Sequence, residues 1–345
     1  MATYDFMSFG EPNIRLTPPG HDRLGQSEVL ELGIAAAELN CCVNIANLSV
    51  ERLLPTLKTA YITKLVDNWT GAYIVKRAMM HGVDMSRVVV EPFDKIGRTR
   101  NGFAFIENGI GPRPSYQLYD RGHTALSKIE PGDIDWEKAL DTRWFHTTGI
   151  VTALGAHTAG EVLAALRAAK KNGARTSYDL NYRATLWERQ DAEAAFEQIL
   201  PYVDVLFGVE PDPVDGVLDY TDPRGYRAAA ERVMERYPNI RAVGSSLREV
   251  KTALRNNWQG CMTTRSGFYV ARKYEDIEIH DRVGAGDSFA SALIWGMLEG
   301  HGAQETVDFA TAYSALCHTI RNDWNLVSRA EAEALAAGGN AGVRR

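Results

Sequence analysis

The chain has 345 residues, of which 45% are hydrophobic and 24% are charged, and its formal net charge is -6 at pH 7. This composition is typical of a globular protein, and the acidic balance excludes the basic surface that nucleic acids and anionic membranes require. The sequence contains no apolar stretch long enough to span a bilayer and no pattern of a cleaved secretion signal. We therefore expect a cytoplasmic protein whose ligands are small molecules.

The cysteines and histidines show no spacing that is typical of a disulfide framework or a metal site. Cys41 and Cys42 are adjacent, Cys261 and Cys317 stand alone, and the eight histidines form no HExxH pattern. We expect four reduced, buried thiols and no dedicated zinc site.

Short apolar or β-branched runs alternate along the chain with longer amphipathic segments. The runs expected to form strands are residues 4–9, 59–65, 144–148, 174–180, 203–207 and 240–244, and the Ala-rich segments expected to form helices are residues 27–48, 157–171, 222–236 and 303–318. This alternation predicts an α/β fold with a doubly wound, mostly parallel sheet that helices cover on both faces.

Two segments interrupt the alternation, residues 10–24 and residues 98–122. In the second, GFAFIE and PSYQLYD are typical of strands, and the Gly- and Pro-rich NGIGPRP joins them. The two segments predict a small β lid inserted into the α/β body. No repeat or linker divides the chain, so we expect a single domain over residues 1–335, followed by a frayed tail over residues 336–345.

Ligands of open α/β sheets bind beyond the carboxyl ends of the strands, where three loops of this chain carry charge. Arg183, in DLNYRATLW, suits a carboxylate or phosphate, or alternatively a surface ion pair. Glu210 and Asp212, in GVEPD, could hold Mg²⁺ through water, or form an acidic pair at a helix N-terminus. GSSLREV offers Ser246 and Arg248 as candidate ligands of nucleotide phosphates.

The most informative stretch is DRVGAGDSFASALIWGML, residues 281–298. Gly284, Ala285 and Gly286 allow a tight turn whose N–H groups join those of the following helix, and together they form a cradle for phosphate oxygens. Asp287 lies where the helix dipole favours its ionised form, so it can accept a proton from an attacking hydroxyl. The alternative is a capped core helix with no ligand.

Together these motifs resemble the PfkB, or ribokinase-like, carbohydrate kinases, and most closely the 2-keto-3-deoxygluconate kinases among them. DRVGAGDSF matches the family signature, and GEPNIRL, GRTRNGFAFIE, SYQLYDRGHTAL, DLNYRATLW and ALCHTIRNDWNLVS look like the corresponding segments of the keto-deoxy-sugar-acid kinases. The resemblance covers nearly the whole chain. It implies a ribokinase-like fold, with ATP and Mg²⁺ as cofactors and K⁺ as a further candidate.

The resemblance also implies individual roles. Asp287 is the expected base for the sugar hydroxyl, and the N–H groups of Gly284, Ala285 and Gly286 are the expected anion hole for the transferring phosphoryl group. The residues implied to surround the sugar acid are Asn40, Tyr119, Arg121 and Arg183, and those implied to lie near the nucleotide are Ser246, Arg248 and Ala312, with Gly284 and Gly286.

The chain departs from the family pattern at three places. Ala35 and Ala36 replace a usual Gly pair, and their methyl groups are expected to narrow the sugar site. Val209 stands where the family has a polar residue near the Mg²⁺, which is expected to alter metal handling. Arg321 and Asn322 stand where relatives often have Pro and Gly, in a loop expected near the nucleotide and the monovalent cation.

The expected function is that of an ATP-dependent kinase that phosphorylates a terminal hydroxyl of a sugar acid, with 2-keto-3-deoxygluconate favoured. The alternatives are a kinase of another sugar, such as fructose or a keto-deoxy inositol product, and a non-catalytic relative that binds sugar or nucleotide. Asp287 and its anion hole argue against the non-catalytic alternative, because a chain without turnover has no chemical need for them. Lid strands leave edges that require cover, so we expect a homodimer or a larger homo-oligomer.

Overall fold

The computed structural model describes residues 2–51 and 54–339. The strands of the body are β1 (Tyr4–Phe9), β6 (Thr59–Val66), β7 (Val83–Glu91), β10 (Thr142–Thr148), β11 (Arg175–Asp179), β12 (Val205–Phe207), β13 (Ala242–Thr252), β14 (Arg255–Thr264), β15 (Gly267–Val270) and β16 (Tyr274–Glu278). The helices are α1 (Ala37–Leu48), α2 (Trp69–Met80), α3 (Trp136–Ala139), α4 (Gly149–Thr152), α5 (Ala156–Lys171), α6 (Arg189–Ile199), α7 (Pro223–Arg236), α8 (Ala285–Glu299), α9 (Ala303–Cys317) and α10 (Arg329–Ala336). Smaller elements are the 3₁₀ turns η1 (Leu126–Lys128) and η2 (Leu200–Tyr202) and the short strands β4 (Val50–Glu51) and β5 (Leu54–Pro55).

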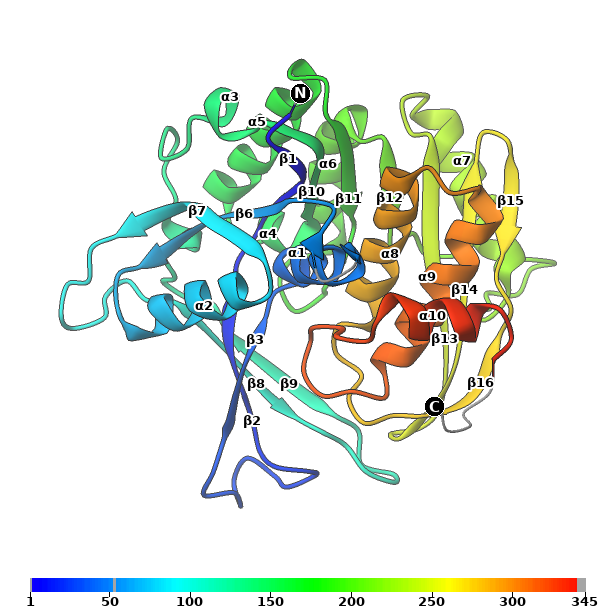
Figure 1. The fold of residues 1–345 in the computed structure, drawn as a ribbon, viewed down its shortest axis with the longest axis horizontal. Coiled ribbons are helices and arrows are strands. Elements are labelled where there is room, and N and C mark those ends of the chain that lie inside the picture. The colour runs from blue at the N-terminus through cyan, green and yellow to red at the C-terminus, as the bar shows by residue number, and fades with distance from the viewer. Residues whose placement is uncertain (1, 52–53, 340–345) are drawn as a thin grey trace.

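The described residues form a ten-stranded central sheet (Figure 1). Its order is β15-β14-β13-β12-β11-β10-β1-β6-β7, and β16 also pairs with β14. All neighbours from β13 to β7 run parallel, whereas β14, β15 and β16 add antiparallel pairs at one end. The predicted mostly parallel α/β sheet is thereby confirmed.

Helices pack on both faces of this sheet. One core cluster takes side chains from α1, α2, α8, α9 and α10, and a second takes side chains from α3, α5, α6 and α7. On β10, Trp144 packs into the first cluster and its neighbour Phe145 into the second, because successive strand side chains point to opposite faces. Strands buried on both faces explain the continuous apolar runs in the sequence.

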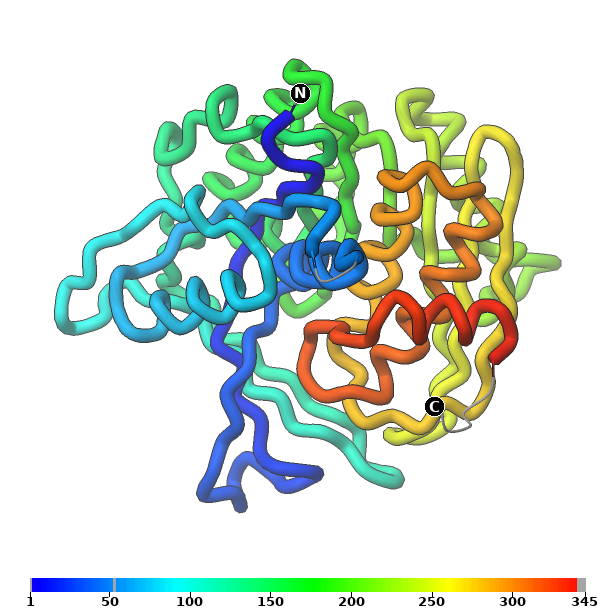
Figure 2. The backbone as a smooth tube through the Cα atoms, viewed as in Figure 1, coloured from blue at the N-terminus to red at the C-terminus, as the bar shows by residue number. Residues whose placement is uncertain are grey.

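A second, four-stranded sheet projects from the body as a lid. It consists of β2 (Asn13–Thr17), β3 (Glu31–Ala35), β8 (Gly102–Glu107) and β9 (Tyr116–Asp120), in the order β3-β2-β8-β9. Figure 2 shows that segments far apart in the sequence, coloured dark blue and cyan-green, lie side by side here. The predicted lid segments contribute β2, β8 and β9, and the predicted hairpin of β8 and β9 is confirmed.

The predicted helix over residues 27–48 is wrong in nearly its first half, residues 27–36. Residues Glu31–Ala35 form β3, which pairs antiparallel with β2, and α1 begins at Ala37. Pairing with β2 therefore overrides the helical propensity of this segment. The extended backbone of Ala36 separates the strand from the helix that follows. The other predicted helices are confirmed within about one residue. Residues 340–345 of the predicted tail lie outside the described residues.

The structure also bears on the cysteines and on membrane crossing. All four cysteines are buried and free of disulfides, as expected. Throughout the part of the chain that is described, no helix combines the length and the apolar character that crossing a bilayer requires.

Candidate active site

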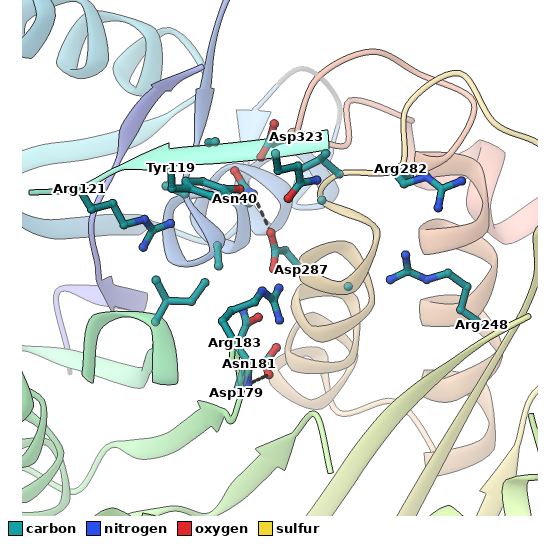
Figure 3. Close-up of a pocket in the computed structure, with 18 residues that line it drawn as sticks. Asn40, Tyr119, Arg121, Asp179, Asn181, Arg183, Arg248, Arg282, Asp287 and Asp323 are labelled. Carbon is teal, nitrogen blue, oxygen red and sulfur yellow. Dashed lines mark hydrogen bonds between the residues drawn. The ribbon is translucent and has the colours of Figure 1, made fainter. Parts of the chain in front are cut away.

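A cavity of about 370 Å³ opens where the lid faces the carboxyl ends of the body strands. Figure 3 shows side chains from the lid, from α1, from the loop after β11 and from the start of α8 around it. The titratable or amide-bearing residues labelled there are Asn40, Tyr119, Arg121, Asp179, Asn181, Arg183, Arg248, Arg282, Asp287 and Asp323. The lid thus closes one side of a site whose floor belongs to the body.

The start of α8 has the backbone geometry of an anion hole. Gly284 precedes the helix in the left-handed region, with φ +86°, and a methyl group on it would overlap the carbonyl oxygen of Asp323. The N–H of Ser288 donates to the carbonyl oxygen of Gly284 at 2.8 Å, so the preceding N–H groups lie before the first intrahelical bond. Space is open around Gly286, where an added methyl group would meet no atom within 4 Å.

Asp287 lies in the first turn of α8 and lines this cavity. Its Oδ2 accepts a hydrogen bond of 2.7 Å from Nδ2 of Asn40, on α1 (Figure 3). Burial raises the pKa of Asp287 to about 6, and the Asp179 carboxylate adds to this effect, whereas Asn40 and Arg183 oppose it. The side chain is therefore mostly ionised at neutral pH and more basic than an ordinary aspartate, which suits a general base.

Tyr119 and Arg121 reach the cavity from β9 of the lid and the residue after it. The Arg121 guanidinium lies over the Tyr119 ring, 4.4 Å from its centroid, and its Nε is 3.7 Å from Oε2 of Glu11. Within the described part of the chain, Nε and Nη1 of Arg121 are buried and have no hydrogen-bond acceptor. Because buried guanidinium donors are costly to leave unpaired, these two favour an anionic ligand in the cavity.

Arg183 follows β11 and lies beside Asp287 (Figure 3). Its Nη1 donates to the carbonyl oxygen of Tyr182 at 3.0 Å. None of the ion pairs found among the described residues includes Arg183, and the residue lines the cavity. Arg183 instead lowers the pKa of Asp287 and of Asp179 against the effect of burial.

A second cavity, of about 380 Å³, adjoins the first. Asp179, Arg183, Arg248 and Gly286 line both cavities, and Ser246 and Glu210 line the second. Figure 3 places Arg248 and Arg282 on the opposite side of Asp287 from Tyr119 and Arg121. The first cavity thus extends to both sides of the carboxylate, and the second cavity adjoins it at Asp179, Arg183, Arg248 and Gly286.

The predicted metal ligands Glu210 and Asp212 line one hollow, but each of them is paired with an arginine. Both Glu210 carboxylate oxygens accept from Nη2 of Arg189, at 2.8 and 2.7 Å. Asp212 pairs with Arg232 and, unlike Glu210, does not line the second cavity. No cluster of three metal-ligating side chains occurs within the described residues.

The remaining predicted residues are placed as follows. Ala35 and Ala36 line the first cavity, as expected from their position before α1. Val209 is buried in the core and also borders the second cavity. Ala312 is fully buried on α9, in a cluster with Trp258, and does not line either cavity.

Sequence reasoning missed five polar or charged residues of the first cavity, namely Gln117, Asp179, Asn181, Arg282 and Asp323. Asp179 ends β11, so the rule that ligands bind at carboxyl ends of strands could have found it. Arg282 lies inside the motif that was singled out, and its charge was the available signal. Asp323 directly follows Arg321 and Asn322, whose loop the resemblance placed near the nucleotide, so the loop was expected there although Asp323 itself was not singled out.

Comparisons with known proteins agree with this geometry. The model of the pfkB family carbohydrate kinase matches residues 5–242 and 255–324. A 2-dehydro-3-deoxygalactonokinase of Haloferax volcanii is 30% identical over 99% of this chain and 100% of its own length. A 2-dehydro-3-deoxygluconokinase of Thermoproteus tenax is 28% identical over 97% of this chain and 94% of its own length.

A solved structure is also similar. The crystal structure of a 2-dehydro-3-deoxygluconokinase from Thermotoga maritima has a TM-score of 0.88 and 36% identity to this chain, and the match covers 97% of this chain and 100% of that one. The family match spans most of the sequence, and the fold, the glycine turn and the aspartate at the start of α8 are those that the sequence motifs predicted. The chain therefore belongs to the pfkB family of carbohydrate kinases.

Proposed function

We propose that this kinase transfers the γ-phosphoryl group of ATP to the terminal hydroxyl of a 2-keto-3-deoxy sugar acid, with 2-keto-3-deoxygluconate as the leading substrate. One observation carries the proposal. Asp287 lies at the N-terminus of α8 and lines the first cavity between Arg121 on the lid side and Arg248, which the first cavity shares with the second. A sugar acid on the lid side and a nucleotide on the other side would meet at the carboxylate.

The chemistry follows from this placement. Asp287 accepts the proton of the sugar hydroxyl, whose oxygen forms a bond to the γ-phosphorus. The bond between that phosphorus and the oxygen bridging it to the β-phosphorus breaks, and ADP leaves with the bonding electrons. The N–H groups of Ala285 and Gly286 and the dipole of α8 stabilise the charge on the transferring phosphoryl oxygens.

The second cavity fits a nucleotide with Mg²⁺. Asp179 and Glu210 line it, and Glu210 would have to release Arg189 to reach an ion there. Mg²⁺ in kinases is commonly held by one or two carboxylates together with phosphates and water. Such an ion would neutralise the phosphate charge during transfer. Ser246 and Arg248 are suited to the phosphates, whereas Asp212 does not line this cavity and is the weaker candidate. A K⁺ requirement is tested by assays in potassium and sodium salts.

Specificity for an acid rests on the lid. Nη1 of Arg121 has no hydrogen-bond acceptor and Nε has only the 3.7 Å ion pair with Glu11, so Arg121, together with Arg183, suits a carboxylate better than a neutral hexose. The galactonate epimer is the second candidate substrate, because the Haloferax volcanii relative is named for it. Asn40 and Tyr119 complete the proposed sugar site.

The test measures ADP release from purified protein with Mg·ATP. The panel comprises 2-keto-3-deoxygluconate, its galactonate epimer, fructose, ribose and gluconate, and Asp287→Asn serves as the control. We expect turnover confined to the keto-deoxy acids and lost in the variant. Turnover of fructose alone would move the assignment to another sugar kinase, and saturable nucleotide binding without ADP release would favour a non-catalytic relative.

We also propose that the chain is a homodimer, or a larger assembly built from one, through its lid. Leu32, Leu16, Phe105 and Leu118 lie in register across the four lid strands, so they share one face. Tyr119, the neighbour of Leu118, lines the cavity, so this apolar row faces away from it. Leu32 and Leu118 are about half exposed, and pairing with a second lid would cover them.

The proposal has two further parts. Residues 1–335 act as one domain with the lid inserted, because lid and body share the cavity. The reaction takes place in the cytoplasm, since four buried cysteines without a disulfide favour a reducing compartment.

A further inference from the structure

A fully buried arginine joins the lid to the loops around the anion hole. Arg15 lies on lid strand β2 with 1% of its surface exposed. Its Nη1 donates to Oδ1 of Asp323 at 2.6 Å, its Nη2 donates to Oδ2 of Asp281, and its Nε donates to Oγ1 of Thr17 at 3.0 Å. Each guanidinium nitrogen therefore has an acceptor, and two of the acceptors are carboxylates 308 and 266 residues away in sequence.

Asp281 connects Arg15 to the turn before α8. While its Oδ2 accepts from Arg15, its Oδ1 accepts from the backbone N–H of Val283 at 3.1 Å. Val283 directly precedes Gly284, the residue with the left-handed backbone. The Asp281 carboxylate thus fixes the backbone of the turn at Val283, immediately before Gly284.

Asp323 connects Arg15 to the same turn by a second route. Its carbonyl oxygen lies so close to Gly284 that a methyl group there would overlap it. The side chain of Asp323 lines the cavity while it accepts from Arg15. A displacement of Asp323 would therefore alter both the space for Gly284 and the wall of the cavity.

The three charges are buried together, with one guanidinium between two carboxylates. Buried ion pairs add little net stability compared with apolar residues of similar volume, because desolvation offsets the attraction. A second contact joins the same regions at the surface, where Arg321 pairs with Glu31 of β3 at 3.1 Å. This pair is exposed, so it contributes little to stability. Of these two connections between lid and body, the buried contacts of Arg15 are the more rigid one.

We propose that Arg15 is a positioning residue for phosphoryl transfer, which fixes the anion hole through Asp281 and Asp323 and ties its geometry to the position of the lid. The catalytic consequence rests on the proposed function. The contacts of Arg15 with Asp281 and Asp323, which we call the clamp, concern only the structure of the turn of residues 281–286. Arg15 does not line the cavity, so it acts through the backbone that it holds. A shift of about 1 Å in such a group can reduce turnover by about 100-fold.

Arg15→Lys tests the proposal, because lysine keeps the charge but loses the planar fork that bridges two carboxylates. Arg113→Lys is the matched control: Arg113 pairs with Glu107 at 2.6 Å inside the lid and does not line the cavity. Two measurements are made on both variants, hydrogen exchange of the amides of residues 280–288 and steady-state kinetics with Mg·ATP and 2-keto-3-deoxygluconate.

For Arg15→Lys we expect faster exchange confined to residues 280–288 and the adjoining loop around residue 323. We also expect kcat to fall by about 10- to 100-fold while KM for the sugar acid changes less than about threefold. Arg113→Lys is expected to match the wild type in both measurements.

Unchanged exchange and unchanged kcat in Arg15→Lys would overturn the proposal, and so would exchange that accelerates equally throughout the chain, which indicates a general role in stability. If the lysine variant does not fold, the triple variant Arg15→Met, Asp281→Asn, Asp323→Asn removes all three charges together, and wild-type exchange at residues 280–288 in it would overturn the clamp. A wild type that phosphorylates none of the keto-deoxy acids refutes the proposed function, whereas the exchange measurement still decides the clamp.

Discussion

The lid sheet and the central sheet meet at one cavity but use their residues in different ways. Strands of the central sheet are buried on both faces, and their contribution to the site comes from the residues and helix N-termini beyond their carboxyl ends. Strands of the lid present one face to the cavity, where Tyr119 and Gln117 line it, and an apolar row to the outside. In the function that we propose, the body therefore supplies the base and the anion hole, and the lid supplies side chains that select the substrate.

This difference predicts a division in kinetics. Changes in the body should lower kcat, because they alter groups that act mainly in the transition state. Changes in the lid should raise KM for the sugar acid and leave kcat closer to that of the wild type. Variants in the body and in the lid test whether the effects on kcat and on KM separate in this way.

The largest effect is expected for Asp287→Asn. The amide keeps the shape and the contact with Asn40 but cannot accept the proton, so kcat should fall by about 10²- to 10⁴-fold. Initial rates of ADP release measure the effect, and Asp308→Asn, on α9 and outside both cavities, should retain wild-type activity. A kcat within a few-fold of the wild type would show that another group is the base.

Two glycines of the anion hole are expected to respond in opposite ways. Gly284→Ala places a methyl against the carbonyl of Asp323 at φ +86°, so unfolding free energy should fall by about 1–3 kcal/mol and activity with it. Gly286→Ala meets open space in the first turn of α8, so stability should rise by about 0.4–1 kcal/mol. Its methyl enters the cavity, however, and kcat should fall.

Urea unfolding and ADP release separate these outcomes. A stable, fully active Gly286→Ala variant would show that the phosphoryl group does not approach this turn. A Gly284→Ala variant as stable as the wild type would show that the Asp323 loop can move away.

On the lid side, Arg121→Ala should raise KM for 2-keto-3-deoxygluconate by about 10- to 100-fold, the value of about 1.5–3 kcal/mol for a hydrogen bond to a charged group. Any neutral sugar that the enzyme accepts should be affected much less, because the two donors without a hydrogen-bond acceptor are matched to a carboxylate. Steady-state kinetics provide the measurement, with Arg98→Ala, an exposed residue near the lid, as the control. Equal effects on acid and neutral sugar would refute carboxylate recognition by Arg121.

The smallest effect concerns pH and stability. Because the pKa of Asp287 is raised to about 6, kcat/KM should rise with pH through about 6 and then level off. In the folded state this carboxyl holds its proton to higher pH than in the unfolded chain, so its contribution to stability falls as pH rises from about 4 to about 6.

Asp287→Asn removes the ionisable carboxyl, and with it the fall in stability that its ionisation causes as the pH rises. The variant should therefore melt at a higher temperature than the wild type at pH 8, and the difference should shrink as the pH is lowered to 4. Thermal unfolding of the two proteins at several pH values measures this difference. A constant difference would mean that Asp287 is not the titrating group.

Much of the candidate site followed from motifs that are local in sequence. Gly284, Gly286 and Asp287 lie within four residues, and a helix N-terminus imposes their arrangement wherever it is placed. Arg183 came from a charged segment at a strand end, which a parallel sheet gathers at one edge, whereas Arg121 came from the resemblance of the lid segment to the kinase family. The pairing of Glu210 with Arg189 and the burial of Ala312 depend on contacts that no local pattern encodes.

The sequence alone determined the α/β class, most of the body strands and helices, and the turn that carries Asp287, because periodicity and glycine placement act over short distances. The tertiary structure decided that residues Glu31–Ala35 are a lid strand rather than the start of a helix, since pairing with β2 outweighs local propensity. It also decided that Arg15, Asp281 and Asp323 meet. A buried charge requires partners of opposite charge, and the partners of Arg15 are distant in sequence, so no local pattern identifies them.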